Sequence, residues 1–240
     1  MVFETFAHTD KGGRKNNEDF CACDKNIWAL ADGLGGHDCG EIASANAVET
    51  LISLWQENQA CMDDESLIKM IDKVNLDIIR RQKENDEVSQ MRTTLVFAVT
   101  DEKTLKFANV GDSRFYYFRN NKIIAQSEDH SVSAAIAKLG EIRYEDIRFN
   151  EDRNKLLKVI GNNENLKIKE LYQPISVQPG DAFLLCSDGF WEYVYEQEME
   201  IDLTKSQNPE DWFSFMAKRV LLRTENKEND NFTAICVMVE

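Results

Sequence analysis

Acidic residues recur at the ends of apolar segments of this chain, a placement that suits metal binding. Asp32-Gly33 and Asp188-Gly189 each follow a continuous apolar run that could be a buried strand. An Asp-Gly pair alone is first of all a turn signal. On a glycine-rich turn, however, a carboxylate can hold a hard cation, because the backbone approaches closely and its carbonyls can also act as ligands.

Further carboxylates occupy comparable positions. Asp112 lies at the exit of another predicted strand, Asp230 precedes a strand, and Glu18 and Asp19 precede a further one. If these strand ends converge, the cluster could not keep all its charge without cations. The expected cations are hard ions that prefer oxygen ligands, Mg²⁺ or Mn²⁺.

The elements that would position these carboxylates are mostly strands. Apolar runs and apolar–polar alternation, bounded by turn residues, predict a meander of antiparallel strands rather than an alternation of strand and helix. The predicted strands are residues 3–9, 20–23, 27–31, 93–99, 105–110, 114–119, 122–125, 166–177, 182–186 and 232–239.

Helices are predicted from helical spacing and from capping residues. Asp38 and Glu41 have the spacing of a capping box at the start of the first helix. Asn208-Pro209 is a strong start for the last, because asparagine caps a helix and proline fits its first turn. Residues 141–165 have few apolar anchors and are expected to be irregular. The first predicted helix begins near residue 38. The other predicted helices span about residues 66–83, 131–139 and 208–222.

The composition favours a single domain, residues 1–240, and excludes several kinds of partner. The chain is long enough for a sizeable core, and no linker, repeat or low-complexity tract divides it. Its net charge of −15 argues against nucleic acid or an anionic membrane as a partner, since both select basic surfaces. No apolar run approaches the ~20 residues of a membrane span, and no signal peptide is recognisable, so a cytoplasmic location is expected.

The cysteines do not indicate a metal site of their own. The six cysteines include no Cys-x-x-Cys pair, and the chain has only three histidines. Structural zinc sites use closely spaced Cys and His pairs. In a cytosolic protein the cysteines are expected to be reduced and mostly buried.

Short motifs that contain the carboxylates follow one another along almost the whole chain. They are Arg14-x-x-Asn-Glu-Asp19, Ala31-Asp-Gly-Leu-Gly-Gly-His37, Thr93-Thr-Leu95, Val110-Gly-Asp-Ser-Arg114, Glu128-Asp-His-Ser131, Gly180-Asp181, Cys186-Ser-Asp-Gly189 and Asp230-Asn-Phe-Thr233. In these motifs and their order, the chain resembles the metal-dependent type 2C protein serine/threonine phosphatases, in their compact bacterial form. The resemblance implies an α+β fold, a four-layer α-β-β-α sandwich of two antiparallel sheets flanked by helices, with a dinuclear metal site at one end.

The resemblance also implies the metal ligands. Asp32 would bridge two Mg²⁺ or Mn²⁺ ions, the Gly33 carbonyl would bind one of them, and Asp188 and Asp230 would bind the other. A second group of residues has weaker assignments. Either Glu18 or the adjacent Asp19 would complete the coordination shell, directly or through water, and Asp112 together with the Asp188 position would hold a third, weaker ion.

The implied chemistry is hydrolysis of phosphoserine and phosphothreonine in proteins. Two metal ions would lower the pKa of a bridging water, giving a hydroxide suited to in-line attack on phosphorus. Arg14 would grip the phosphate oxygens with its planar fork. His37 is the candidate acid for the leaving oxygen, although some family members place a histidine directly after the Asp-Gly pair, where this chain has Leu34. The implied partners are phosphorylated proteins and the serine/threonine kinase that acts on them, and the acidic surface favours a monomer.

Simpler roles stay open for several residues. Asp112 could form an Asx-type turn, Arg14 a surface ion pair, and His37 a helix cap. The protein could also be a non-catalytic phosphoprotein-binding module with this fold, although such a module would be expected to have lost ligands. A third possibility is hydrolysis of small phosphate esters.

Two features of the chain, compared with the family pattern, bear on the substrate. Arg92 precedes the Thr-Thr-Leu motif, where the family usually has a small residue, often glycine, and it could alter packing or substrate approach. Residues 140–155 occupy the place of a mobile flap beside the family's active site. Substrate selection is expected to lie in that segment.

Overall fold

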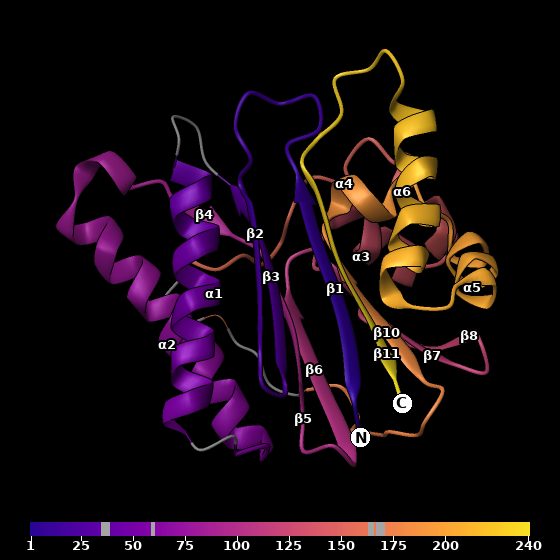
Figure 1. The fold of residues 1–240 in the computed structure, drawn as a ribbon. Coiled ribbons are helices and arrows are strands. Elements are labelled where there is room, and N and C mark those ends of the chain that lie inside the picture. Colours follow the sequence, from indigo (N-terminus) through magenta and orange to yellow (C-terminus); the bar gives the residue numbers. More distant parts are fainter. Residues whose placement is uncertain (35–38, 59–60, 163–165, 167–170) are drawn as a thin grey trace.

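Two β-sheets lie face to face at the centre of the molecule, and helices cover the outer side of each (Figure 1). The computed structural model describes residues 1–34, 39–58, 61–162, 166 and 171–240. Its four layers confirm the predicted α+β sandwich. Within these described ranges, no helix is long and apolar enough to cross a membrane.

The first sheet joins the first and last strands of the chain. In order across the sheet, its strands are β1 (Phe3–Asp10), β11 (Phe232–Val239), β10 (Ala182–Cys186), β7 (Arg114–Arg119) and β8 (Lys122–Gln126). All neighbours are antiparallel. The end of β10 therefore lies beside the starts of β7 and β11, at one end of the sheet.

The second sheet carries the other strands. They are β2 (Asp19–Asp24), β3 (Ile27–Leu34), β5 (Leu95–Thr100), β6 (Thr104–Val110) and β9 (Ile175–Ser176), with the short β4 (Arg92–Thr93) paired to the end of β3. The prediction of a strand over residues 166–177 was wrong in its length. In the described part of this segment, only the two residues of β9 form a strand, which pairs with β6. Pro174 stands just before β9, and proline has no N–H for a strand ladder.

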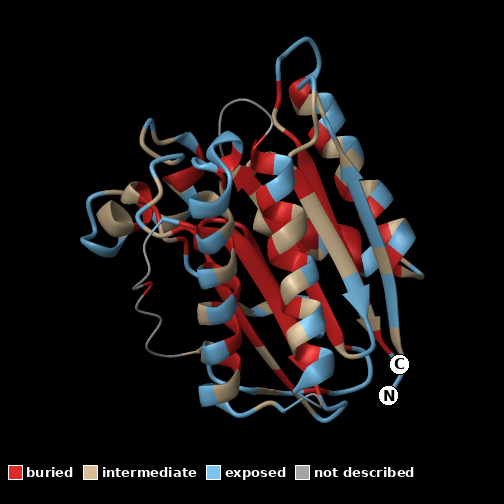
Figure 2. Ribbon diagram, turned by 90° about the vertical axis from the view of Figure 1, so that its left-hand side faces the viewer, coloured by how far each residue is buried: buried red, intermediate tan, exposed pale blue. Residues whose placement is uncertain are grey.

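The central strands are buried on both faces, which explains the continuous apolar runs in the sequence. In β3, Ile27 and Ala29 pack toward the helices, whereas Trp28 and Leu30 pack between the sheets. Successive side chains of a strand point to opposite faces, so a strand between two apolar layers needs apolar residues at every position. Figure 2 shows the buried sheets beneath helices whose outer surfaces are exposed.

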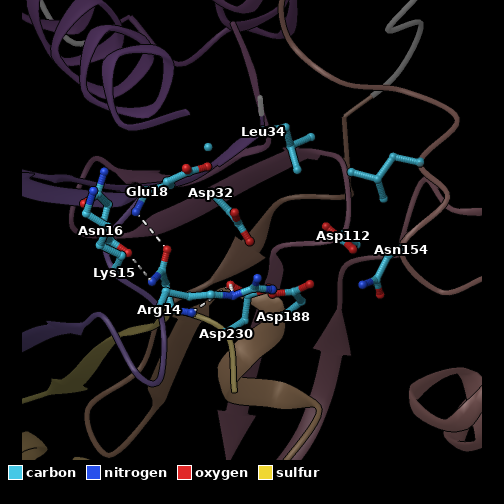
Figure 3. Close-up of a pocket in the computed structure, with 13 residues that line it drawn as sticks. Arg14, Lys15, Asn16, Glu18, Asp32, Leu34, Asp112, Asn154, Asp188 and Asp230 are labelled. Atoms are coloured by element: carbon cyan, nitrogen blue, oxygen red, sulfur yellow. Dashed lines mark hydrogen bonds and ion pairs between the residues drawn. The ribbon is translucent and has the colours of Figure 1, made fainter. Parts of the chain in front are cut away.

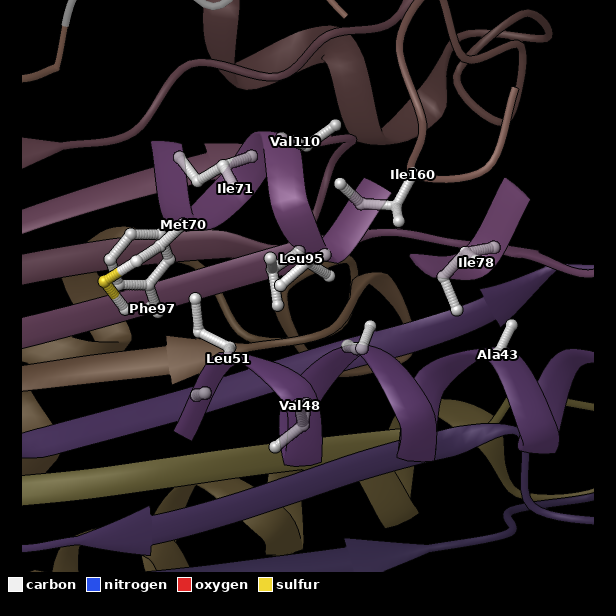
Figure 4. Close-up of a cluster of buried hydrophobic side chains, with 14 of the residues drawn as sticks. Ala43, Val48, Leu51, Met70, Ile71, Ile78, Leu95, Phe97, Val110 and Ile160 are labelled. Atoms are coloured by element: carbon white, nitrogen blue, oxygen red, sulfur yellow. The ribbon is translucent and has the colours of Figure 1, made fainter. Parts of the chain in front are cut away.

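Helices α1 (Cys39–Glu57) and α2 (Asp64–Glu84) cover the second sheet. Figure 4 shows Leu51 of α1 and Met70 of α2 gathered near Phe97 of β5. Each fully buried side chain of this size contributes roughly 1.5–3 kcal/mol. This packing fixes the helices on the sheet and holds the strands that lead to the cavity described below.

The helices near the first sheet were only partly predicted. Helices α3 (Val132–Lys138) and α6 (Pro209–Thr224) agree with the prediction. The Asn208 side chain caps α6 by accepting from the Asp211 N–H at 2.8 Å. Helices α4 (Asp188–Trp191) and α5 (Glu196–Lys205) were not predicted from the sequence, because α4 is a single turn and α5 buries little apolar surface. Part of the segment predicted as irregular forms a 3₁₀ helix, η2 (Tyr144–Phe149), and a further 3₁₀ helix, η1 (Asp86–Val88), lies after α2.

Candidate active site

Strand β3 delivers Asp32 to one end of the sandwich. The Asp32 N–H donates to Thr94 Oγ1 at 2.9 Å. Its carbonyl accepts from the Thr94 N–H at 2.8 Å and from the Thr93 hydroxyl at 2.8 Å. Three hydrogen bonds therefore fix the backbone of Asp32, and its carboxylate lines the cavity.

Gly33 lies where the chain is too closely packed for a side chain. A Cβ at this position would be 2.1 Å from the Gly40 carbonyl oxygen and 2.7 Å from that of Glu18. The Gly33 N–H also donates to the Glu18 carbonyl at 3.0 Å. The glycine thus lets α1 and the segment before β2 pack directly on the end of β3.

Asp188 and Asp230 come from neighbouring strands of the other sheet. Asp188 follows β10, and Asp230 precedes β11. Ser187 links the two strands, because its N–H donates to the Thr233 carbonyl at 3.1 Å and its hydroxyl accepts from the Thr233 N–H at 3.0 Å. Antiparallel pairing places the end of one strand beside the start of the next, so the two carboxylates are brought together.

These strand ends surround a cavity of about 470 Å³, called here the carboxylate cavity. Figure 3 shows Asp32, Asp112, Asp188 and Asp230 around the same space, with Arg14 along one side. Six of the seven predicted metal ligands line it, and only Asp19 does not. The lining residues are Arg14, Lys15, Asn16, Glu18, Asp32, Gly33, Leu34, Asp112, Asn154, Leu156, Asp188, Asp230 and Asn231.

Burial and mutual repulsion oppose ionisation of these carboxylates. Burial raises the pKa of Asp32 and of Asp188 well above the usual range, and neighbouring carboxylates raise both further. The pKa of Asp112 rises to about 7, mainly through burial and then through the charge of Asp129. A cation among them would counter the repulsion, because a nearby opposite charge favours the ionised form.

Two buried oxygens at the site, Asp188 Oδ1 and Asp19 Oδ1, accept no hydrogen bond from the described residues. An unsatisfied buried carboxylate oxygen is costly, and a metal ion is a partner that would satisfy it. Among the side chains of the described residues, no three of the His, Cys, Asp or Glu type are arranged to hold one ion as they stand. The donor set therefore fits a hard divalent cation in its chemistry, and side chains would have to shift to ligate it.

Arg14 binds Asp230 in a bidentate pair. Arg14 Nε donates to Asp230 Oδ1 at 3.0 Å, and Arg14 Nη2 donates to Oδ2 at 2.8 Å. Both side chains remain partly exposed, at 57% and 42%. The ion pair that was the simpler alternative for Arg14 is thus present, and it holds the guanidinium at the carboxylate cavity.

Asp19 lies opposite Asp32 on the neighbouring strand and points to the interior. Its Oδ2 accepts from the Ser187 hydroxyl at 2.7 Å. Burial raises the pKa of Asp19 to about 6, although the hydrogen bond from Ser187 lowers it in part. Of the pair Glu18 and Asp19, only Glu18 lines the carboxylate cavity.

The predicted proton donor, His37, lies outside the described residues, as does the predicted helix cap, Asp38. His130 lies in the described part of the chain, and its Nδ1 accepts from the Gly111 N–H at 3.3 Å. Burial lowers the pKa of His130 to about 4. His130 is therefore neutral at physiological pH and supports the segment that leads to Asp112.

Three supporting residues were given no role in the sequence analysis. Thr94 holds the backbone of Asp32, and Ser187 links β10 to β11 and to Asp19. The Asn231 side chain accepts from the Glu18 N–H at 2.8 Å and donates to two carbonyls of the loop after β1 at 2.9 Å. All three belong to the quoted motifs, so their adjacency to candidate ligands was the available signal.

Comparison with known proteins agrees with this geometry. Residues 8–234 match the family model of protein phosphatase 2C. The serine/threonine phosphatase stp of Listeria welshimeri is 37% identical over 202 residues, which cover 82% of this chain and 77% of that protein. The crystal structure of Stp1 from Staphylococcus aureus matches with a TM-score of 0.86 at 30% identity, covering 100% of this chain and 96% of that chain.

A structure of the catalytic domain of the phosphatase PstP in complex with two manganese ions has the same fold, with a TM-score of 0.83 at 24% identity and coverage of 99% and 98%. The family model spans the strands and loops that surround the carboxylate cavity. The resemblance inferred from the motifs is confirmed. The chain belongs to the protein phosphatase 2C family of serine/threonine phosphatases.

Proposed function

We propose that this protein hydrolyses phosphoserine and phosphothreonine in other proteins, using Mg²⁺ or Mn²⁺ held at the carboxylate cavity. The observation that carries the proposal is the convergence of four aspartates from separate strand ends on one cavity beside Arg14. Family membership supports the reaction, and the manganese complex of PstP supports the type of ion.

The main ligands of two ions would be the aspartates at the ends of the central strands. Asp32, the Gly33 carbonyl, Asp188 and Asp230 would together hold these ions. The raised pKa of Asp32 and of Asp188 supports this assignment, because bound cations would offset the burial and the repulsion that raise it. The unsatisfied Asp188 Oδ1 supports it further.

The remaining acidic residues would act around that pair of ions. Glu18 lines the cavity and would complete the shell directly or through water. Asp19 would contact the ions through a bound water, from which its unsatisfied, buried Oδ1 could accept a hydrogen bond. Asp112 together with Asp188 would hold a third, weaker ion.

Bound Mg²⁺ or Mn²⁺ would supply a water of lowered pKa and would offset the charge of the phosphate. Arg14 would bind the phosphate oxygens, because its planar guanidinium suits bidentate contact with an oxyanion as it now contacts Asp230. His37 would protonate the leaving serine or threonine oxygen. Direct attack by water needs no phosphoenzyme, so no cysteine takes part.

We further propose that the partners are phosphorylated proteins, including substrates of a serine/threonine kinase. The net charge of −15 disfavours nucleic acid and anionic membranes as partners. We propose that residues 1–240 act as one domain, as a monomer and in the cytoplasm.

Phosphate release from a phosphothreonine peptide tests the proposal. We expect turnover with Mn²⁺ or Mg²⁺, none in excess EDTA, and a loss of about a hundredfold or more in Asp188→Asn. Calorimetric titration with Mn²⁺ gives an independent readout, in which Asp188→Asn should bind the ion more weakly. Equal turnover with and without EDTA, or full activity of Asp188→Asn, would refute the proposal.

The same assay separates the alternative functions. Turnover of p-nitrophenyl phosphate without turnover of the phosphopeptide would indicate a hydrolase of small esters. Stable capture of the phosphopeptide without phosphate release would indicate a binding module.

A further inference from the structure

A second groove, of about 440 Å³, opens beside the carboxylate cavity. The two share Leu34, Asn154 and Leu156 in their linings, so they adjoin one another. The other described residues of the groove include Arg92, which gives it the name Arg92 groove. A ligand seated in the carboxylate cavity could therefore extend into the Arg92 groove.

The guanidinium of Arg92 has no acidic partner among the described residues. Its Nε is buried and donates no hydrogen bond. The chain has 43 acidic against 28 basic residues. Arg92 is half-buried, and the two fully buried arginines of the described residues are both paired, Arg114 with Asp129 at 2.8 Å and Arg148 with Glu196 at 2.6 Å. A buried donor left without an acceptor is costly. Because Arg92 as a whole is only half-buried, the accessible part of its side chain can meet an acceptor brought by another molecule.

The chemistry of the Arg92 groove is opposite to that of the carboxylate cavity. None of its described lining residues is acidic, and Arg92 is the cation among them. Gln90, Asn154 and Asn162 add amide groups that can bind a peptide backbone. A planar guanidinium beside neutral amides suits a carboxylate or a phosphate, which it can bind bidentately.

Strand pairing fixes the distance between the two sites. Arg92 lies opposite Leu34, one position beyond the Thr93 hydroxyl that donates to the Asp32 carbonyl. Adjacent strands are ~4.8 Å apart and residues advance ~3.3 Å along a strand, so the backbones of Arg92 and Asp32 lie within roughly 10 Å. That separation corresponds to about one to three residues of an extended peptide.

We propose that Arg92 is a specificity-determining residue, which binds an anionic side chain one to three positions from the phosphoresidue of the substrate. The inference rests on the phosphatase function proposed above. The anionic side chain is a carboxylate or a second phosphate, since both present the same paired oxygens. Arg92 contacts the substrate away from the reacting phosphate, so its effect falls mainly on KM.

Matched phosphothreonine peptides test the proposal. One has alanine at the three positions on each side, one has glutamate there, and one carries a non-hydrolysable phosphonate analogue of phosphoserine two positions away. For the wild type, we expect kcat/KM to be about three- to tenfold higher for the anionic peptides than for the alanine peptide, mostly through KM. Comparing the glutamate and phosphonate peptides shows which anion Arg92 prefers.

Three variants identify the residue responsible. Arg92→Gln should bring the anionic-to-alanine ratio close to one, and Arg92→Lys should restore part of it. Arg80→Gln removes an equal charge from an exposed position on α2 and should leave the ratio unchanged.

A ratio of one in the wild type, or a ratio that Arg92→Gln leaves unchanged, would overturn the inference. If the wild type still hydrolyses the alanine peptide, the proposed function stands in either case. If no peptide is hydrolysed at all, the proposed function fails and this inference fails with it. Because the wild-type ratio is itself decisive, the test survives a variant that does not fold.

Discussion

The carboxyl group of Asp112 is held by the fold in surroundings that disfavour its ionised form. Its side chain is buried, and its pKa is raised to about 7, from an ordinary value near 4. When folding raises the pKa of a carboxyl group, the folded state binds the proton more tightly than the unfolded chain. The free energy of unfolding therefore falls as the pH rises from about 4 to about 7.

Asp112→Asn should stabilise the protein in EDTA at pH 7, by roughly 2–4 kcal/mol, and have little effect at pH 4. Asparagine keeps the shape of the side chain and removes the buried charge. Urea unfolding of both proteins at the two pH values measures the difference. Asp101→Asn is a suitable control, because hydrogen bonds from the Thr104 and Lys103 N–H groups lower the pKa of Asp101, so its replacement should bring no gain. An equal gain at both pH values would contradict an electrostatic origin.

Arg14→Lys tests whether Arg14 is more than a surface ion pair. Lysine keeps the charge but loses the bidentate fork that now contacts Asp230, so kcat/KM for a phosphothreonine peptide should fall about 10- to 100-fold. The free energy of unfolding should change by less than about 1 kcal/mol, because the pair is partly exposed. Unchanged kinetics would leave Arg14 with a structural role alone.

Among the elements, the strands and helices with strong apolar patterns were predictable. Strands β10 and β11 were apparent because both faces are buried, and α6 because of its cap at Asn208. Helix α5 was not, since few of its residues face the core. The candidate ligands were found because each stands at a strand end. The supporting contacts of Thr94 and Ser187 were not, because they depend on the register between strands distant in sequence.

Gly189 controls how closely α4 approaches β11, and a methyl group there should be poorly tolerated. A Cβ would lie 2.1 Å from the Asn231 carbonyl oxygen. Gly189→Ala should destabilise the protein by about 2–4 kcal/mol and weaken Mn²⁺ binding, because Asp188 and Asp230 adjoin the two segments. Thermal unfolding and calorimetric titration measure the two effects.

Gly140→Ala is the matched control for this variant. No atom of the described residues lies within 4 Å of a Cβ at Gly140, but its φ is +77°, so the substitution carries only a backbone cost of about 1 kcal/mol. If Gly140→Ala were the more destabilising of the two, close packing at Gly189 would not be the cause.

The whole molecule is held together by the core between its two sheets. Trp28 and Phe183 belong to this inter-sheet core, and their rings meet at 4.9 Å between centroids. Trp55 lies in the core under α1, whereas Trp212 lies in the core under α6. We expect both outer cores to unfold in one transition, because each shares its sheet with the core between them.

Variants that keep only Trp55 or only Trp212 test this cooperativity. Within each variant, the fluorescence transition in urea should have the same midpoint as the transition followed by far-UV circular dichroism. Two separate midpoints would show that the chain consists of two domains.

The pairing of β1 with β11 determines how this protein could be joined to others. Phe3 lies opposite Val239, whereas Asp10 and Phe232 lie some 25 Å away, next to the segments that carry Arg14 and Asp230. Both chain ends therefore emerge far from the carboxylate cavity (Figure 1). If a fused domain, a membrane tether or a solid support were attached at either terminus, the end of the sandwich that carries the carboxylate cavity would point away from it. Attachment through either terminus would therefore leave the carboxylate cavity accessible to phosphorylated proteins.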